Sequence, residues 1–102
     1  MRFETTRSFD ADYRGLSDAE ARLFRKALES FVRACDRYAA DPSEKWPAAL
    51  RVKGVEGAPG VWEMTWSFAG PDGRATFEFV QVGGSLGVRW RRVGNHSIFK
   101  RP

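Results

Sequence analysis

The sequence has little of the chemistry that most often marks a catalytic or metal site. Its 102 residues include one cysteine and one histidine, so an internal disulfide is excluded and a zinc site of the common nitrogen and sulfur kind is not expected. No apolar run approaches the roughly 18–20 residues of a membrane span, and the first ten residues carry charges where a secretion signal is apolar. These absences predict a single cytoplasmic domain over residues 1–102, with no metal and no cofactor.

Acidic side chains are absent from the last quarter of the chain. The net charge is +4, and residues 79–102 hold five cations, no carboxylate and the histidine. A terminal excess of positive charge favours contact with a polyanion, but it is also typical of a solubilising tail. The five cations are Arg89, Arg91, Arg92, Lys100 and Arg101.

The first half of the chain predicts a strand followed by one long helix. Residues 2–9 are rich in β-branched and aromatic side chains and predict the strand, and residues 10–15 predict a turn or a single helical turn. Ser17 and Glu20 have the spacing of a capping box, which begins a helix, and Pro42 ends it near residue 40. An apolar stripe at spacings of three and four residues predicts that this helix packs on an apolar surface. The stripe consists of Phe24, Leu28, Phe31, Cys35 and Tyr38.

The second half supplies that surface as strands of alternating polar and apolar residues. Turn signals separate the later strands at residues 70–73 and 83–84. The alternating segments are residues 50–55, 61–68, 74–79 and 88–93.

Placing the apolar side chains of the two central strands on one face predicts how these strands pair as a hairpin. If Ser67 lies opposite Arg74, then Glu63 lies opposite Glu78, and all the large apolar side chains share one face. Those side chains are Trp62, Met64, Trp66, Ala75, Phe77 and Phe79. The predicted fold class is therefore α+β, a twisted antiparallel sheet with an amphipathic helix, or a helical hairpin, packed on one face.

The uncovered face of this sheet is expected to be polar, with more cations than carboxylates. One interpretation is that it is an ordinary solvated face, as antiparallel sheets often have. The other is that it binds RNA, because arginine suits bidentate contact with phosphate. The residues on this face are Arg51, Lys53, Glu63, Thr65, Ser67, Arg74, Thr76, Glu78, Arg89 and Arg91. Arg89 and Arg91 are expected to flank the two glutamates and offset their repulsion.

The residue types needed to cleave RNA without a metal are present on or near this face. A base removes the 2′-hydroxyl proton, cations stabilise the charge on the phosphate, and an acid protonates the leaving oxygen. Histidine serves either proton role near neutral pH, which makes His96 a candidate, and Glu63 is a candidate base. Phe99 could stack on a nucleobase. Cations that could hold the phosphate are Arg74, Lys53, and Arg91 or Arg92. The competing interpretation is that His96 is simply exposed and that Phe99 fills the core.

Several short motifs follow one another in an informative order. After the strand and the capped helix come Leu50-Arg-Val-Lys-Gly, Gly60-Val-Trp-Glu-Met, Gly73-Arg-Ala-Thr-Phe and the closing His96-Ser-Ile-Phe99. Their order and spacing resemble the RelE/ParE superfamily, the toxins of bacterial type II toxin–antitoxin systems. The closing His-x-x-Phe is similar to that of the YafQ branch, in which the histidine transfers a proton.

The resemblance implies a toxin whose partners are a cognate antitoxin, the ribosome and mRNA, and which acts as a ribosome-dependent mRNA endonuclease. It implies a catalytic set and an RNA-binding set of residues. The catalytic set is His96, Arg74, Glu63 and Arg91, and the RNA-binding set is Lys53, Arg51, Arg89, Arg92 and Phe99. Two alternatives remain open, an inhibitor of DNA gyrase like the ParE branch and an inactive, toxin-like binding module.

Overall fold

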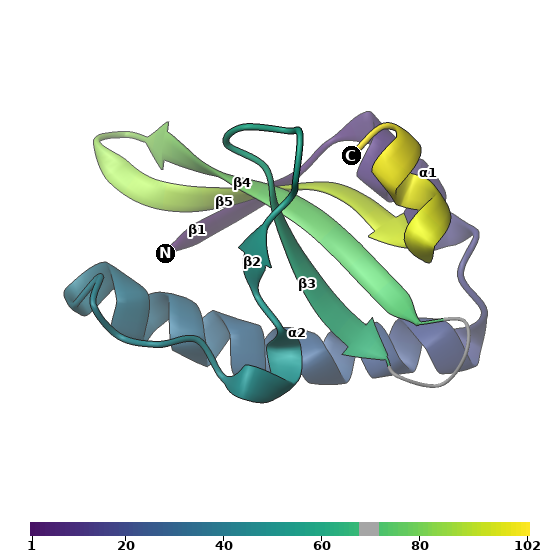
Figure 1. Cartoon of the computed structure of the whole chain (residues 1–102), viewed down its shortest axis with the longest axis horizontal. Helices are drawn as coiled ribbons and strands as arrows, with labels where there is room; N and C mark the ends of the chain where they lie inside the picture. The colour runs from purple at the N-terminus through teal and green to yellow at the C-terminus, as the bar shows by residue number, and fades with distance from the viewer. Residues whose placement is uncertain (68–71) are drawn as a thin grey trace.

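The computed structural model of the chain describes residues 1–67 and 72–102. Within these residues, two α-helices lie with a five-stranded sheet (Figure 1). The strands are β1 (Arg2–Thr5), β2 (Lys53–Gly54), β3 (Trp62–Ser67), β4 (Gly73–Val82) and β5 (Ser85–Gly94). The helices are α1 (Arg7–Arg14) and α2 (Asp18–Ala40), with short 3₁₀ helices η1 (Ala48–Leu50) and η2 (His96–Lys100).

The sheet is mixed rather than purely antiparallel. Its strand order is β1-β5-β4-β3-β2, and β2 to β5 pair antiparallel with their neighbours. β1 pairs parallel with β5, with Phe3 opposite Val88. No hairpin joins these two strands, so nothing in the connection imposes an antiparallel pairing. The predicted α+β class is confirmed, and the antiparallel prediction is wrong for β1.

Helix α2 covers one face of the sheet, as its apolar stripe predicts. The Ser17–Glu20 capping box is formed, and the helix ends at Ala40. Phe31 has no exposed surface and lies with its ring centroid 5.0 Å from that of Phe77 and 4.9 Å from that of Trp90. In Figure 1 this long helix runs along the lower side of the sheet. Burial of these aromatic rings stabilises the fold by about 25 cal/mol per Å² of apolar area.

The N-terminal strand is shorter than predicted. β1 ends at Thr5, and residues predicted as a strand end followed by a turn or a single helical turn form helix α1. The Thr6 hydroxyl caps this helix by accepting a hydrogen bond from the Phe9 amide, and Phe9 is buried in the core. The N-cap threonine outweighs the β propensity of the residues around it.

The central hairpin pairs two residues away from the predicted register. Glu63 lies opposite Thr76 and Thr65 opposite Arg74, with an irregularity between Thr65 and Ser67. A shift of two residues leaves every side chain on its predicted face, so Met64, Trp66, Ala75 and Phe77 are all buried in the core. The predicted pair of Glu63 with Glu78 does not form.

Gly73 lets the Trp66 ring pack directly against β4. It belongs to strand β4, and a side chain there would meet the Trp66 ring at 2.4 Å. The Trp66 indole nitrogen donates to the Arg74 carbonyl at 2.9 Å. Residues 70 and 71 of the predicted turn lie outside the described residues, and its last residue, Gly73, belongs to β4. The Gly83–Gly84 turn is confirmed, with both glycines at positive φ.

The strand predicted over residues 50–55 is reduced to the two residues of β2. Leu50 ends η1 and is buried, and Arg51 follows in a left-handed conformation with φ of 47°. A left-handed residue interrupts an extended strand, so Arg51 does not lie on the sheet face as predicted. No helix among the described residues is long and apolar enough to cross a membrane.

Candidate functional site

A β-bulge in β5 brings two arginines to the same side of the sheet. Thr76 pairs with Arg92 and Phe77 pairs with Trp90, so Arg91 is the extra residue. A bulge bends the strand and redirects its side chains. Arg91 and Arg92 therefore line one cleft together, although adjacent residues of a regular strand point to opposite faces.

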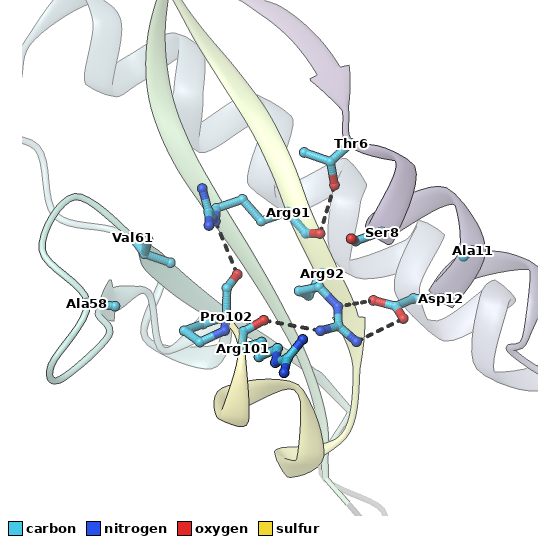
Figure 2. A pocket seen from close by; sticks show the side chains of 10 residues that line it. All are labelled: Thr6, Ser8, Ala11, Asp12, Ala58, Val61, Arg91, Arg92, Arg101 and Pro102. Carbon is cyan, nitrogen blue, oxygen red and sulfur yellow. Dashed lines mark hydrogen bonds and ion pairs between the residues drawn. The ribbon is translucent and has the colours of Figure 1, made fainter.

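The cleft has a volume of about 730 Å³ and lies on the face of the sheet opposite α2 (Figure 2). Strand β5, helix α1, the loop before β3 and the C-terminal residues all contribute to its walls. It combines guanidinium groups with small apolar side chains. The lining residues are Thr6, Ser8, Ala11, Asp12, Ala58, Val61, Arg91, Arg92, Arg101 and Pro102.

Asp12 of α1 holds Arg92 in place. Its carboxylate accepts two bonds from the guanidinium, from Nε at 2.6 Å and from Nη2 at 3.1 Å, and a third from the Val93 amide at 3.2 Å. The hydrogen bond from Arg92 to Asp12 is the main reason that the pKa of Arg92 is raised. This fork attaches α1 to β5 and fixes the direction of the Arg92 side chain.

Glu78 of β4 holds Arg91 in place in the same way. Its carboxylate accepts from Arg91 Nη1 at 3.0 Å and from Arg89 Nη1 at 2.9 Å. Arg89 also contacts Glu4 of β1 at 2.5 Å, and the pKa of Arg89 is raised first by the bond to Glu4 and then by the bond to Glu78. The predicted flanking of Glu78 by Arg89 and Arg91 is therefore confirmed. Glu63 instead lies beside Lys53, with Nζ and Oε1 4.0 Å apart.

The last two residues close one side of the cleft. Arg91 Nε donates to the Pro102 carbonyl oxygen at 3.1 Å, and Arg92 Nη1 donates to the Arg101 carbonyl oxygen at 3.1 Å. Thr76, which is fully buried, donates its hydroxyl to the same Pro102 oxygen at 2.9 Å. Figure 2 shows both arginine side chains joined to this segment by dashed lines.

Arg74 does not line the cleft. It is 7% exposed, and its guanidinium bonds Asp72 and the Gly73 carbonyl, each at 3.3 Å. The predicted sheet-face position for Arg74 is therefore a buried, paired position.

The chain's one histidine also lies outside the cleft. His96 begins η2, is exposed, and contacts the Phe99 ring edge-on with centroids 5.6 Å apart. Phe99 is half-buried, and its neighbour Ile98 is the residue that fills the core. The structure thus brings Arg91 and Arg92 together and leaves His96, Glu63 and Arg74 apart from them. In residues 1–67 and 72–102, no group of three or more His, Cys, Asp or Glu side chains could hold a metal ion.

The architecture is similar to that of a solved structure. A YoeB/ParE toxin from Agrobacterium tumefaciens superposes with a TM-score of 0.60, covering 94% of this chain and 99% of its own, at 15% identity. The chain has the YoeB/ParE toxin fold. No family model and no curated protein matches the sequence. The fold predicted from the motif order is confirmed by this likeness.

In this YoeB/ParE toxin fold, the residues that organise the cleft are ones that the sequence pattern does not single out. Asp12 sits in a segment predicted as a turn, and Glu78 was expected to face Glu63. Thr76 looked like one more polar residue of a solvated face. The one signal in the sequence is that the arginines of residues 89–92 have no carboxylate near them in the chain. Because a half-buried guanidinium group requires an acidic partner, its partner must come from another segment.

Proposed function

We propose that the chain is the toxin of a type II toxin–antitoxin system, and that it binds and cleaves mRNA on the ribosome without a metal. Two observations support this function, the YoeB/ParE toxin fold and the cleft in which Arg91, Arg92 and Arg101 meet. The cleft carries the proposal. Fixed guanidinium groups beside small apolar side chains suit a phosphodiester with its attached sugar.

The proposed roles follow the positions of the residues. Arg91 and Arg92 hold the phosphate, each oriented by its own carboxylate, Glu78 or Asp12. His96 transfers a proton and Phe99 stacks on a base. η2 has five residues and is therefore about 10 Å long, so the RNA strand would run from the cleft along η2 toward His96.

The other candidate residues are assigned supporting roles under the same proposal. Glu63 remains a second candidate base, and Lys53 beside it contributes positive charge, as do Arg51 and Arg89. Arg74 supports the β3–β4 hairpin through Asp72 and is a candidate phosphate contact only where that ion pair opens.

Gyrase inhibition, as in the ParE branch, is the second candidate function. One observation favours it: His96, Glu63 and Arg74 are not among the residues that line the arginine cleft. A protein that acts by binding alone has no need to gather acid and base groups in one place.

An apolar groove supports the proposed antitoxin partner. It has a volume of about 410 Å³ and lies between β1, α1 and α2, with Phe9, Phe24 and Trp90 among its lining residues. Phe3, which also lines it, is 38% exposed. Large exposed apolar side chains beside a groove are typical of protein-binding surfaces, and we assign this groove to the antitoxin.

Controlled expression in bacteria, with primer-extension mapping of mRNA and a plasmid supercoiling assay, separates the candidates. Nuclease action predicts growth arrest with new mRNA 5′ ends, and about a hundredfold weaker cleavage for Arg91→Ala because the phosphate loses a fixed cation. His96→Gln is expected to relieve arrest as well. Arg22→Ala, a change of an exposed arginine on α2, is the matched control and should remain fully toxic.

The other outcomes identify the alternatives. Arrest with altered supercoiling and intact mRNA would identify a gyrase inhibitor. Normal growth with soluble, folded protein would identify a binding module. Undiminished mRNA cleavage by both Arg91→Ala and His96→Gln would remove the assignment of these residues.

A further inference from the structure

Three donors, two arginines of the cleft and the buried Thr76 beside them, converge on two neighbouring main-chain oxygens. Arg91 Nε and the Thr76 hydroxyl both donate to the Pro102 oxygen, and Arg92 Nη1 donates to the Arg101 oxygen. All three donors belong to β4 and β5, the two central neighbours in the sheet. Residues 101–102, here called the closing segment, thus bond the side chains that face the cleft from the sheet.

The bond from Arg92 to the closing segment is weaker than the same donor can make. The Arg101 oxygen that accepts it is a neutral amide carbonyl, whereas Arg92 is a cationic guanidinium. A guanidinium bonds an anionic oxygen about twice as strongly as a neutral one. The buried Thr76 hydroxyl also needs an acceptor, which an anionic oxygen in the same position would supply.

The closing segment can leave the cleft without unfolding its neighbours. It follows η2, which is held by Ile98, a residue only 3% exposed, and by the Asn95 side chain at its start. Arg101 is exposed, and one backbone bond, from its amide to the Ile98 carbonyl, ties it back to η2. Release of the two oxygens requires a rotation after Lys100 and breaks this one backbone bond.

We propose that the closing segment is an internal stand-in for phosphate, which a nucleic acid strand displaces from Arg91, Arg92 and Thr76 in order to bind. This inference rests on the proposed function at one point: it takes the ligand to be an RNA phosphodiester. The closing segment then lowers the affinity of the cleft by the fraction of time for which it is in place.

The test measures binding of a trinucleotide with 2′-O-methyl groups, which cannot be cleaved by attack of its 2′-oxygen, by calorimetry at one fixed salt concentration. A chain ending at Lys100 is compared with the full chain. If the closing segment is in place nine-tenths of the time, the shorter chain binds about tenfold more tightly. This gain is expected even though the deletion removes the positive charge of Arg101.

Arg101→Ala is the matched control. It removes the same charge but keeps both main-chain oxygens, so it is expected to bind the trinucleotide more weakly than the full chain. If the shorter chain binds no more tightly than the Arg101→Ala variant, or if neither full nor shortened chain binds, the inference is overturned.

A second measurement uses the unaltered chain and so does not depend on how the deletion folds. The ¹⁵N–¹H NOE of the Arg101 amide is expected to fall toward the value of a flexible segment as the trinucleotide is added, while that of Ile98 stays constant. An unchanged Arg101 signal at saturation contradicts the displacement.

The two proposals fail separately. Displacement without mRNA cleavage or growth arrest in cells would leave the closing segment as inferred and remove the nuclease function. Cleavage that depends on Arg91, with no gain of affinity on shortening, would leave the function and remove the inference.

Discussion

The two faces of the sheet are organised by different forces. The face under α2 is aromatic, and its contacts are between rings, such as Phe31 with Phe77 and with Trp90. The opposite face is held by arginine–carboxylate pairs, Arg92 with Asp12 and Arg91 with Glu78. Apolar packing is nearly non-directional, whereas each ion pair requires particular atoms at particular distances. The first face is therefore specified by which side chains are apolar, and the second by which arginine meets which carboxylate.

The largest effect expected is from Phe31→Ala on the aromatic face. Phe31 has no exposed surface, so its truncation leaves a cavity and is expected to lower the free energy of unfolding by about 3–5 kcal/mol. Urea unfolding measures the change. Arg91→Ala on the opposite face is expected to lose about 1 kcal/mol or less. Equal losses for the two variants would contradict the proposed difference between the faces.

Gly73→Ala tests how the aromatic face sets the register of β3 against β4. The new methyl would meet the Trp66 ring at 2.4 Å, and overpacking of this kind costs about 1–3 kcal/mol. Gly54→Ala is the matched control, because nothing lies within 4 Å of its new methyl, and it is expected to stay within about 0.5 kcal/mol of the parent. Thermal or urea unfolding of both variants gives the comparison.

Asp12→Asn tests the polar face. The substitution keeps the shape of the side chain but removes the charge that orients Arg92, and a loss of about 1.5 kcal/mol is expected for a hydrogen bond to a charged group. The loss should shrink as salt concentration rises, unlike that of Phe31→Ala. Glu29→Gln, an exposed charge removal on α2, is the control and is expected to change stability little.

The smallest effect expected is the pH dependence from Cys35 in the aromatic core. Burial raises the pKa of its thiol from 9.0 to about 12. Below pH 9 the thiol is protonated in both states, and above it the unfolded chain loses the proton first, so stability falls between pH 9 and 12. At pH 10 the loss is about 1 kcal/mol. The fall in unfolding free energy from pH 8 to pH 10 should be smaller in Cys35→Ala.

Most of the fold could be predicted from periodicity, because burial alone decides it. The stripe on α2 and the alternation in β3 and β4 each assign side chains to a face, and a two-residue shift keeps that assignment. The exceptions have local causes. Thr6 caps α1 in a segment of high β propensity, and the left-handed Arg51 interrupts the predicted strand.

The candidate site could be predicted only in part. The sequence offers Arg91 and Arg92 as alternative phosphate contacts. The bulge that places both of them in the cleft has no signature in the local sequence. Asp12 lies eighty residues from Arg92 in the chain, and no local pattern links residues so far apart. The burial of Arg74 depends on the pairing of β4 with β3, where the predicted register was wrong.

The parallel pairing of β1 with β5 has a consequence for synthesis of the chain. Domains form as the polypeptide emerges from its N-terminal end, yet residues 2–5 have no partner strand until residues 87–90 have been made. The cleft has the same dependence, because Asp12 is made early and Arg92 late. The arginine cleft can therefore assemble only after residues 91 and 92 have been made, and shorter nascent chains cannot carry a finished cleft.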